Sequence, residues 1–340
     1  MTTARHPAPA HGSIADASSP AVSLRDVAAY YRRHSTTPSR RWSATTLIVL
    51  VYLVAQVIFI RVILPASGLD AATQRQVFAW FCVATALYTG FLGWLIWRNI
   101  ARQVRVDRLA SASGLLYSER EAVSRFAGTV LQRPGRQFAT DVVTTDVGSD
   151  LDFAAATFAL SAGLTPRRAG FVQIRLERTT PHIVLENRRS RVLRSSGSRF
   201  RHNQRLSLEG DFDRHFTLYC PEGYERDALY IFTPDLMALM IDVAADCEIE
   251  LVDGSLILYV GHPWRLWKPR RFAAMLTLTD ALGAKATRQT RRYSDDRALP
   301  GAQLAEEGRR LRVRLTAGSI LSIAAPLALG IYGVISLFYR

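Results

Sequence analysis

The sequence predicts a membrane protein with three transmembrane helices and a soluble α+β domain that contains a largely antiparallel sheet. The first observation is an uncharged run of 21 residues, Val77–Trp97. As a helix it spans roughly 31 Å, about the hydrocarbon thickness of a bilayer. Two further apolar runs, 46–64 and 318–340, have similar lengths. The region 98–317 instead contains short alternating segments and turn signals, which indicate strands.

The ends of these runs support the transmembrane interpretation. Trp80 and Trp94 lie near opposite ends of Val77–Trp97, and aromatic side chains favour the membrane–water interface. The run 46–64 contains one charge, Arg61, whose side chain lies close enough to the end to reach the headgroups rather than mark an ion path. A buried helix of a soluble protein and a signal peptide are the alternatives. The long apolar runs and the extended charged region before the first of them argue against both.

The chain is expected to comprise four segments. The N-terminal segment has a composition typical of disorder, followed by a short amphipathic helix that opens at the capping-box-like Ser23–Asp26. The polar turn Pro65–Gln76 joins the spans 46–64 and 77–97 into a helical hairpin. The segments are 1–42 (N-terminus), 43–97 (transmembrane hairpin), 98–317 (α+β domain and basic linkers) and 318–340 (C-terminal transmembrane helix).

The distribution of arginines predicts the orientation in the membrane. Basic residues concentrate at the cytoplasmic ends of spans, and here they form three clusters on one side, whereas the hairpin turn holds only Arg75. The N-terminus and the α+β domain are therefore expected in the cytoplasm, and the arginine-rich composition is typical of a bacterial inner membrane protein from a GC-rich genome. The clusters are Arg25, Arg32, Arg33, Arg40 and Arg41; Arg98, Arg102, Arg105 and Arg108; and Arg309, Arg310, Arg312 and Arg314.

Two faces of small residues predict helix packing. They recur every fourth position in the second and third spans, and small residues let transmembrane helices approach closely. The third helix is expected to pack on the hairpin, or the faces form a contact between two copies of the chain. The faces consist of Cys82, Ala86 and Gly90, and of Gly318, Ser322, Pro326 and Gly330.

Turn residues predict the helices of the soluble domain. A basic helix is expected to continue from the second span through 98–130. Thr233 and Pro234 suit the N-cap and first position of a second helix. A last helix is predicted at 269–282, ending at Gly283 and followed by a polar linker at 284–308. The buried stripe of the second helix is predicted as Leu236, Met237, Met240, Ile241 and Ala244.

Alternation of apolar and polar residues predicts the strands. Asp253–Gly254 is a strong signal for a tight hairpin turn between two of them. Thr179–Pro181 indicates a second hairpin-like connection. The predicted strands are 171–178, 182–187, 215–220, 228–232, 248–252 and 256–260.

Three of these segments carry a resemblance. Phe212–Tyr219, Ala228–Met237 and Gly254–Tyr259 together resemble the soluble domain of a family of uncharacterised bacterial membrane proteins. The resemblance covers roughly 50 of 340 residues and departs from the family pattern at Cys220–Gly223 and in the preceding arginine-rich stretch. It implies a cytosolic α+β domain and supplies no catalytic residue.

Residues with catalytic or metal-binding chemistry do not form a recognisable pattern. The three cysteines form no CxxC pair, and the nucleotide-binding, hydrolase and metalloprotease motifs are absent. No metal, cofactor or disulfide is therefore expected. An enzyme remains the alternative hypothesis, and would need a buried cluster, for example around His215 and Asp227. The residues considered are Cys82, Cys220 and Cys247, the histidines His182, His202, His215 and His262, and Asp295–Asp296, interpreted as solvated.

The stretch Arg188–Arg205 is the strongest candidate for a binding function. It contains seven arginines and no acidic residue, and its centre, Ser195–Ser198, is typical of a flexible loop. Contact with anionic phospholipid or another polyanion and a solvated loop are both open interpretations. RNA binding is disfavoured because only Phe200 supplies an aromatic ring. The candidate contact residues are Arg188, Arg189, Arg191, Arg194, Arg199, Arg201 and Arg205.

The sequence therefore favours a binding role. A domain tethered to the membrane at both ends is expected to act as a scaffold or sensor that presents a basic face to anionic lipid, a protein partner or a second copy of the chain. A membrane-surface enzyme is the alternative. A transporter is disfavoured because three spans with one peripheral charge offer no polar pathway.

Overall fold

The computed structural model describes two compact units, divided after Asp107. The C-terminal helix predicted at 318–340, residues 46–50 and 53 of the span 46–64, and the predicted disordered residues before 21 lie outside the described part of the chain. The described residues are 21–34, 51–52, 54–68, 70–132, 138–146, 149, 151–160, 167–190, 192–195, 200–208 and 210–312.

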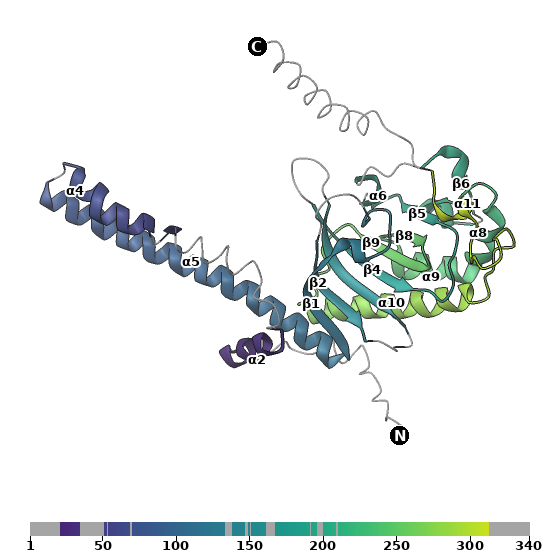
Figure 1. The fold of residues 1–340 in the computed structure, drawn as a ribbon, viewed down its shortest axis with the longest axis horizontal. Helices are drawn as coiled ribbons and strands as arrows, with labels where there is room; N and C mark the ends of the chain where they lie inside the picture. Colours follow the sequence, from purple (N-terminus) through teal and green to yellow (C-terminus); the bar gives the residue numbers. More distant parts are fainter. Residues whose placement is uncertain are drawn as a thin grey trace, which may run out of the picture. The chain divides into compact units, whose positions relative to one another are not determined.

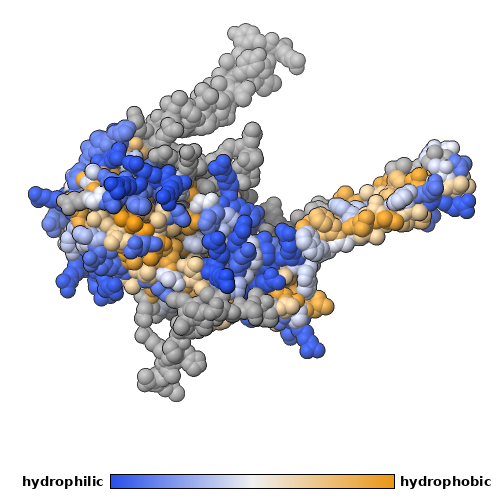
Figure 2. Space-filling model, turned by 180° about the vertical axis from the view of Figure 1, so that it is seen from behind, coloured by the Kyte–Doolittle hydropathy of each residue, from blue (hydrophilic) through white to orange (hydrophobic). Residues whose placement is uncertain are grey.

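The N-terminal unit is built on one long helix of 42 residues, α5 (Ala71–Ala112), whose last five residues, 108–112, belong to the C-terminal unit. It is the only helix in the described part that is long and apolar enough to cross a membrane. Figure 2 shows hydrophobic residues covering much of this arm, and Trp80 is 71% and Leu87 70% exposed. The prediction of an apolar helix at Val77–Trp97 is confirmed. The prediction of three transmembrane spans is not confirmed, because only one candidate helix is found within the described residues.

A second helical segment lies antiparallel to α5. It includes a π-helical turn, η1 (Phe59–Ile63), followed by α4 (Leu64–Ala66). The Phe59 ring stacks on Phe81 with centroids 4.1 Å apart, and the Gln56 amide donates to the Thr85 hydroxyl at 3.1 Å. Contacts of this kind hold two neighbouring helices side by side. This segment contacts α5 through Phe81 and Thr85, whereas Cys82, Ala86 and Gly90 are exposed.

The turn between these helices is shorter than predicted. The sequence indicated a polar turn at 65–76, but α5 already begins at Ala71. The Asp70 carboxylate accepts hydrogen bonds from the amides of Ala72 and Thr73 at 3.0 and 3.1 Å. This N-cap satisfies amides that otherwise lack an intrahelical partner, and so extends the helix toward the turn.

A short helix, α2 (Leu24–His34), packs in the same unit. Its predicted capping box is confirmed: the Ser23 amide donates to the Asp26 carboxylate at 2.7 Å, and the Asp26 amide donates to the Ser23 hydroxyl at 3.3 Å. Arg33 forms an ion pair at 3.4 Å with Asp107, whose side chain is buried.

The C-terminal unit contains a nine-stranded sheet within the described residues, with α10 (Pro269–Thr290) lying along one face (Figure 1). The order is β1-β2-β3-β4-β9-β8-β5-β7-β6, and every neighbouring pair is antiparallel, which confirms the predicted α+β class. The strands are β1 (Leu115–Ala122), β2 (Phe138–Thr145), β3 (Phe153–Leu160), β4 (Arg167–Arg175), β5 (Ile183–Asn187), β6 (Arg205–Leu206), β7 (Phe216–Tyr219), β8 (Cys247–Val252) and β9 (Ser255–Val260).

One predicted hairpin is confirmed and the other is wrong. Asp253 and Gly254 join β8 to β9 with φ of 49° and 68°, the two positive values that a tight type I′ turn requires. The strands on either side of Thr179–Pro181 do not pair with each other. The Leu176 amide instead donates to the Gly254 carbonyl at 2.8 Å, so the chain passes the β8–β9 turn before β5 begins on the other side of that hairpin.

Two helix predictions and one strand prediction need correction. The helix expected through residue 130 ends at Ala112, because Gly114 turns the chain with a φ of 69° and β1 follows. The strand predicted at 228–232 is helical, in α8 (Glu225–Ile231), since a short apolar run does not distinguish the two forms. Gly283 lies inside α10, where an added Cβ would come 2.8 Å from the Leu151 side chain. That glycine permits close packing and does not end the helix.

The predicted second helix is α9 (Pro234–Ala244), with Pro234 at its start as expected. Its apolar stripe is only partly buried: Leu236, Met240 and Ala244 are covered, whereas Met237 and Ile241 are half-buried. The helix therefore packs on the domain through a narrower face than predicted. The remaining short helices are α6 (Val192–Ser195), η3 (His202–Gln204), α7 (Phe212–His215), α11 (Glu306–Arg309) and η2 (Val123–Arg125).

Candidate functional site

The structure separates the predicted arginine cluster into two groups. Arg188 and Arg189 follow the end of β5, whose last residue, Asn187, lies opposite Phe216. Arg205 lies opposite Tyr219, at the other end of β7, with Arg201 just before it. All four are exposed, and none forms an ion pair with another described residue. Arg191, Arg199 and the side chain of Arg194 lie outside the described part.

The stretch between them is not a wholly solvated loop. Leu193 is fully buried, and Val192 and Phe200 are 3% and 6% exposed, so apolar side chains anchor it in the core. The Leu193 amide also donates to the Glu248 carboxylate at 2.8 Å. Burial, with nearby Glu186, raises the pKa of Glu248 to about 7. The predicted flexible centre of the arginine-rich stretch, Ser195–Ser198, falls largely outside the described residues.

The segment predicted as a polar linker, 284–308, is ordered: it begins inside α10, which ends at Thr290, and its last residues belong to a strap. We call residues 304–312 the C-terminal strap. The Leu311 amide donates to Nδ1 of His182 at 2.9 Å, and the His182 amide donates to the Gly308 carbonyl at 2.8 Å. Arg310 forms a bidentate ion pair with Asp253 at 2.8 and 2.6 Å. Backbone and side-chain contacts thus fasten the strap along its length.

The end of the strap is held beside Arg201 and Arg205. With its side-chain amide turned to satisfy both partners, Gln204 donates to the Arg312 carbonyl at 2.9 Å and accepts from the Arg312 amide at 3.1 Å. Gln204 is buried, whereas the side chain of Arg312 is exposed. We call Arg201, Arg205 and Arg312 the exit cluster, because Arg312 is the last described residue before the predicted third span.

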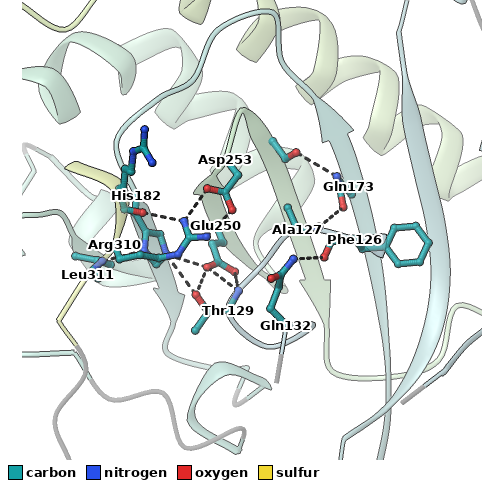
Figure 3. Close-up of polar contacts among 12 residues, drawn as sticks. Phe126, Ala127, Thr129, Gln132, Gln173, His182, Glu250, Asp253, Arg310 and Leu311 are labelled. Carbon is teal, nitrogen blue, oxygen red and sulfur yellow. Dashed lines mark hydrogen bonds and ion pairs between the residues drawn. The ribbon is translucent and has the colours of Figure 1, made fainter. Parts of the chain in front are cut away.

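A buried polar network lies beneath the strap (Figure 3). Nδ1 of His182 accepts from Leu311, so the ring proton is on Nε2 and is donated to Glu250 at 2.8 Å. The Tyr259 hydroxyl donates to the same carboxylate at 2.7 Å, and the amide and hydroxyl of Thr129 also donate to it. Burial alone raises the pKa of a carboxyl, but these hydrogen bonds outweigh it and lower the pKa of Glu250. Glu250 is therefore ionised.

The bonds of this network hold the fold together. His182 is 2% and Glu250 0% exposed, and each has its polar atoms occupied within the protein. A substrate therefore has no access to the pair. The network joins four segments that are distant in the sequence: the turn that contains Thr129, His182 just before β5, the β8–β9 hairpin and the strap. One sign of it is visible in the sequence: the acids Glu248 and Glu250 stand at alternate positions in an otherwise apolar strand.

A second network fastens the segment between α10 and the strap. Asp295, predicted as solvated, is buried and accepts from the Tyr224 hydroxyl at 2.7 Å and the Ala305 amide at 2.9 Å. Arg297 donates to it at 2.9 Å and also pairs with Asp227. Burial raises the pKa of Asp295, but the hydrogen bonds outweigh it and lower the value to about 2.

The cluster imagined around His215 and Asp227 is not found. Asp227 accepts from the Tyr293 hydroxyl at 2.9 Å and pairs with Arg297, whereas the His215 ring lies against Phe216. Cys220 and Cys247 are buried and unpaired, and burial raises the pKa of each thiol to about 12. Among the described residues no group of three or more potential ligands is placed to hold a metal ion.

Comparison with known proteins yields no assignment. No protein-family model matches this chain. No curated protein and no solved structure matches it either. The geometry of the described residues therefore carries the functional argument alone.

Proposed function

We propose that this chain is an integral membrane protein whose α+β domain faces the cytoplasm and binds anionic phospholipid through the exit cluster. The observation that carries the proposal is the clasp between Gln204 and Arg312. It brings Arg312, the last described residue before the predicted third span, close to Arg201 and Arg205.

The length of the remaining chain supports contact with the membrane. Five residues, 313–317, separate Arg312 from Gly318, where the third span is predicted. At up to about 3.6 Å per residue, the connection reaches at most about 20 Å. If 318–340 crosses the bilayer, the exit cluster is within that distance of its surface.

The charges of the exit cluster support an anionic partner. Its three side chains are exposed, and none forms an ion pair with a described acidic residue. Attraction of a basic residue to an anionic leaflet is worth about 1 kcal/mol, so three arginines contribute about 3 kcal/mol. That is more than a hundred-fold in affinity. The binding surface is therefore three arginines of the exit cluster, and not the seven arginines of the stretch Arg188–Arg205.

Hydrogen exchange of the full chain in nanodiscs tests this function. With anionic lipid, amides of 200–208 and 311–312 are expected to exchange at least ten-fold more slowly than with zwitterionic lipid. The variant Arg201→Ser/Arg205→Ser/Arg312→Ser should lose that difference. The control Arg226→Ser/Arg270→Ser/Arg288→Ser removes the same charge from exposed sites elsewhere and should keep it. Equal exchange in both lipids, or equal loss in both variants, contradicts the proposal.

A further inference from the structure

A polar hollow of about 470 Å³ opens on the domain, lined by residues of the turn after η2, the end of β4 and the β8–β9 turn. That volume is within the range of small-ligand sites. The hollow is distinct from the exit cluster, since Arg201, Arg205 and Arg312 do not line it. We propose that it binds a small phosphorylated polyol, either free or as the headgroup of a lipid.

The charges of the lining favour an anion. Its two acids each have an arginine partner: Glu177 accepts a bidentate pair from Arg291, and Asp253 accepts one from Arg310. Arg178 also lines the hollow, is exposed, and forms no ion pair with a described carboxylate. An exposed guanidinium without a carboxylate partner is suited to bidentate binding of phosphate.

Two further arginines line the hollow and strengthen its positive potential. Arg125 pairs with Glu121 at 2.8 Å, and Arg175 pairs with Asp152 at 3.4 Å, but both side chains are about 70% exposed. Surface pairs of this kind are weak, and an arginine retains donors for a second partner. A phosphate in the hollow would therefore meet donors from three arginines.

The uncharged lining favours hydroxyl groups over a nucleobase. Thr179, Ser255 and three glutamines supply hydroxyl and amide groups, and no aromatic residue is among the described residues that line the hollow. Bases are commonly bound by stacking on aromatic rings, whereas sugar hydroxyls are bound by amides and hydroxyls. A phosphorylated polyol fits this combination of groups.

Hydrogen bonds already fix the frame of the hollow. Oε1 of Gln173 accepts from the Ala127 amide at 2.9 Å, and its Nε2 donates to the Ser255 hydroxyl at 3.1 Å (Figure 3). Nε2 of Gln132 donates to the Phe126 carbonyl at 3.2 Å. The same turn holds Thr129, whose amide binds Glu250. A frame fixed before binding lowers the entropy lost by the site.

Isothermal titration of the full chain in zwitterionic nanodiscs tests the inference, with glucose 6-phosphate as the probe. Saturable binding is expected, and glucose alone should bind at least ten-fold more weakly. Arg178→Ala should weaken binding at least ten-fold. The control Arg270→Ala removes an exposed arginine outside the hollow and should change it less than two-fold.

A second arm identifies a lipid source. Hydrogen exchange at Arg178–Thr179 is measured in nanodiscs with and without phosphatidylinositol phosphate. The original chain, Arg178→Ala and the exit-cluster variant are each measured in both. Protection lost in Arg178→Ala but kept in the exit-cluster variant assigns a lipid headgroup to the hollow. No effect of Arg178→Ala in either arm overturns the inference. Membrane contact at the exit cluster has its own variant, so the two proposals fail separately.

Discussion

Replacing Glu250 by glutamine is expected to lower the free energy of unfolding of the α+β domain by about 3 kcal/mol at pH 7. The ionised carboxylate accepts from His182, Tyr259 and Thr129 in a fully buried site. A glutamine has one acceptor oxygen and brings an NH₂ group toward donors, so at least one buried donor loses its partner. Such losses in a buried charged network cost about 3–5 kcal/mol.

A matched control lies two residues away on the same strand. Glu248 is as deeply buried, but burial raises its pKa to about 7, so its ionised form is disfavoured by folding. Glu248→Gln should therefore leave stability at pH 8 unchanged or increase it. Unfolding is measured as the urea dependence of hydrogen exchange in β8 and β9. Equal destabilisation by the two substitutions would show that Glu250 is not the charged centre of the network.

Replacing Asp295 by asparagine is expected to cost about 2 kcal/mol and to loosen the C-terminal strap. Its pKa of about 2 lies below the ordinary value of 3.8, a shift that corresponds to about 2 kcal/mol. Because the folded-state pKa is lowered, this stability is present above pH 4 and is lost as the pH falls toward 2. The variant should lack this loss.

The neighbouring Asp296 provides the control. It is exposed, whereas Asp295 accepts from the Ala305 amide at the start of the strap's short helix. Hydrogen exchange of residues 304–312 at pH 7 should accelerate in Asp295→Asn and stay unchanged in Asp296→Asn. Similar exchange in both variants would mean that Asp295 does not fasten the strap.

Local patterns predicted the parts of the fold that local forces determine. The β8–β9 hairpin follows from Asp253–Gly254, because few residue pairs adopt two positive φ values. The start of α9 follows from Pro234, whose fixed φ suits the first helical turn. The apolar part of α5 follows from Val77–Trp97, a run of 21 residues without a charge. Each of these signals lies within a few neighbouring residues.

The strap and its networks depend on contacts that are distant in the sequence. His182 and Leu311 are separated by 129 residues, and the bond between them uses a backbone amide, which leaves no side-chain pattern. Asp295 lies in a polar stretch that has no hydrophobic period, so its burial by Tyr224 could not be read locally. The division of the arginine stretch likewise follows from strand pairing and not from sequence spacing.

Fluorescence quenching tests the central claim, that the exit cluster lies against an anionic membrane. A fluorophore is attached at His202→Cys, an exposed position between Arg201 and Arg205, in a Cys82→Ser background, since Cys220 and Cys247 are buried. The nanodiscs carry nitroxide-labelled headgroups. Quenching is expected to be much stronger in anionic than in zwitterionic lipid, and to lose that dependence in the exit-cluster variant. Equal quenching in both lipids would contradict the account.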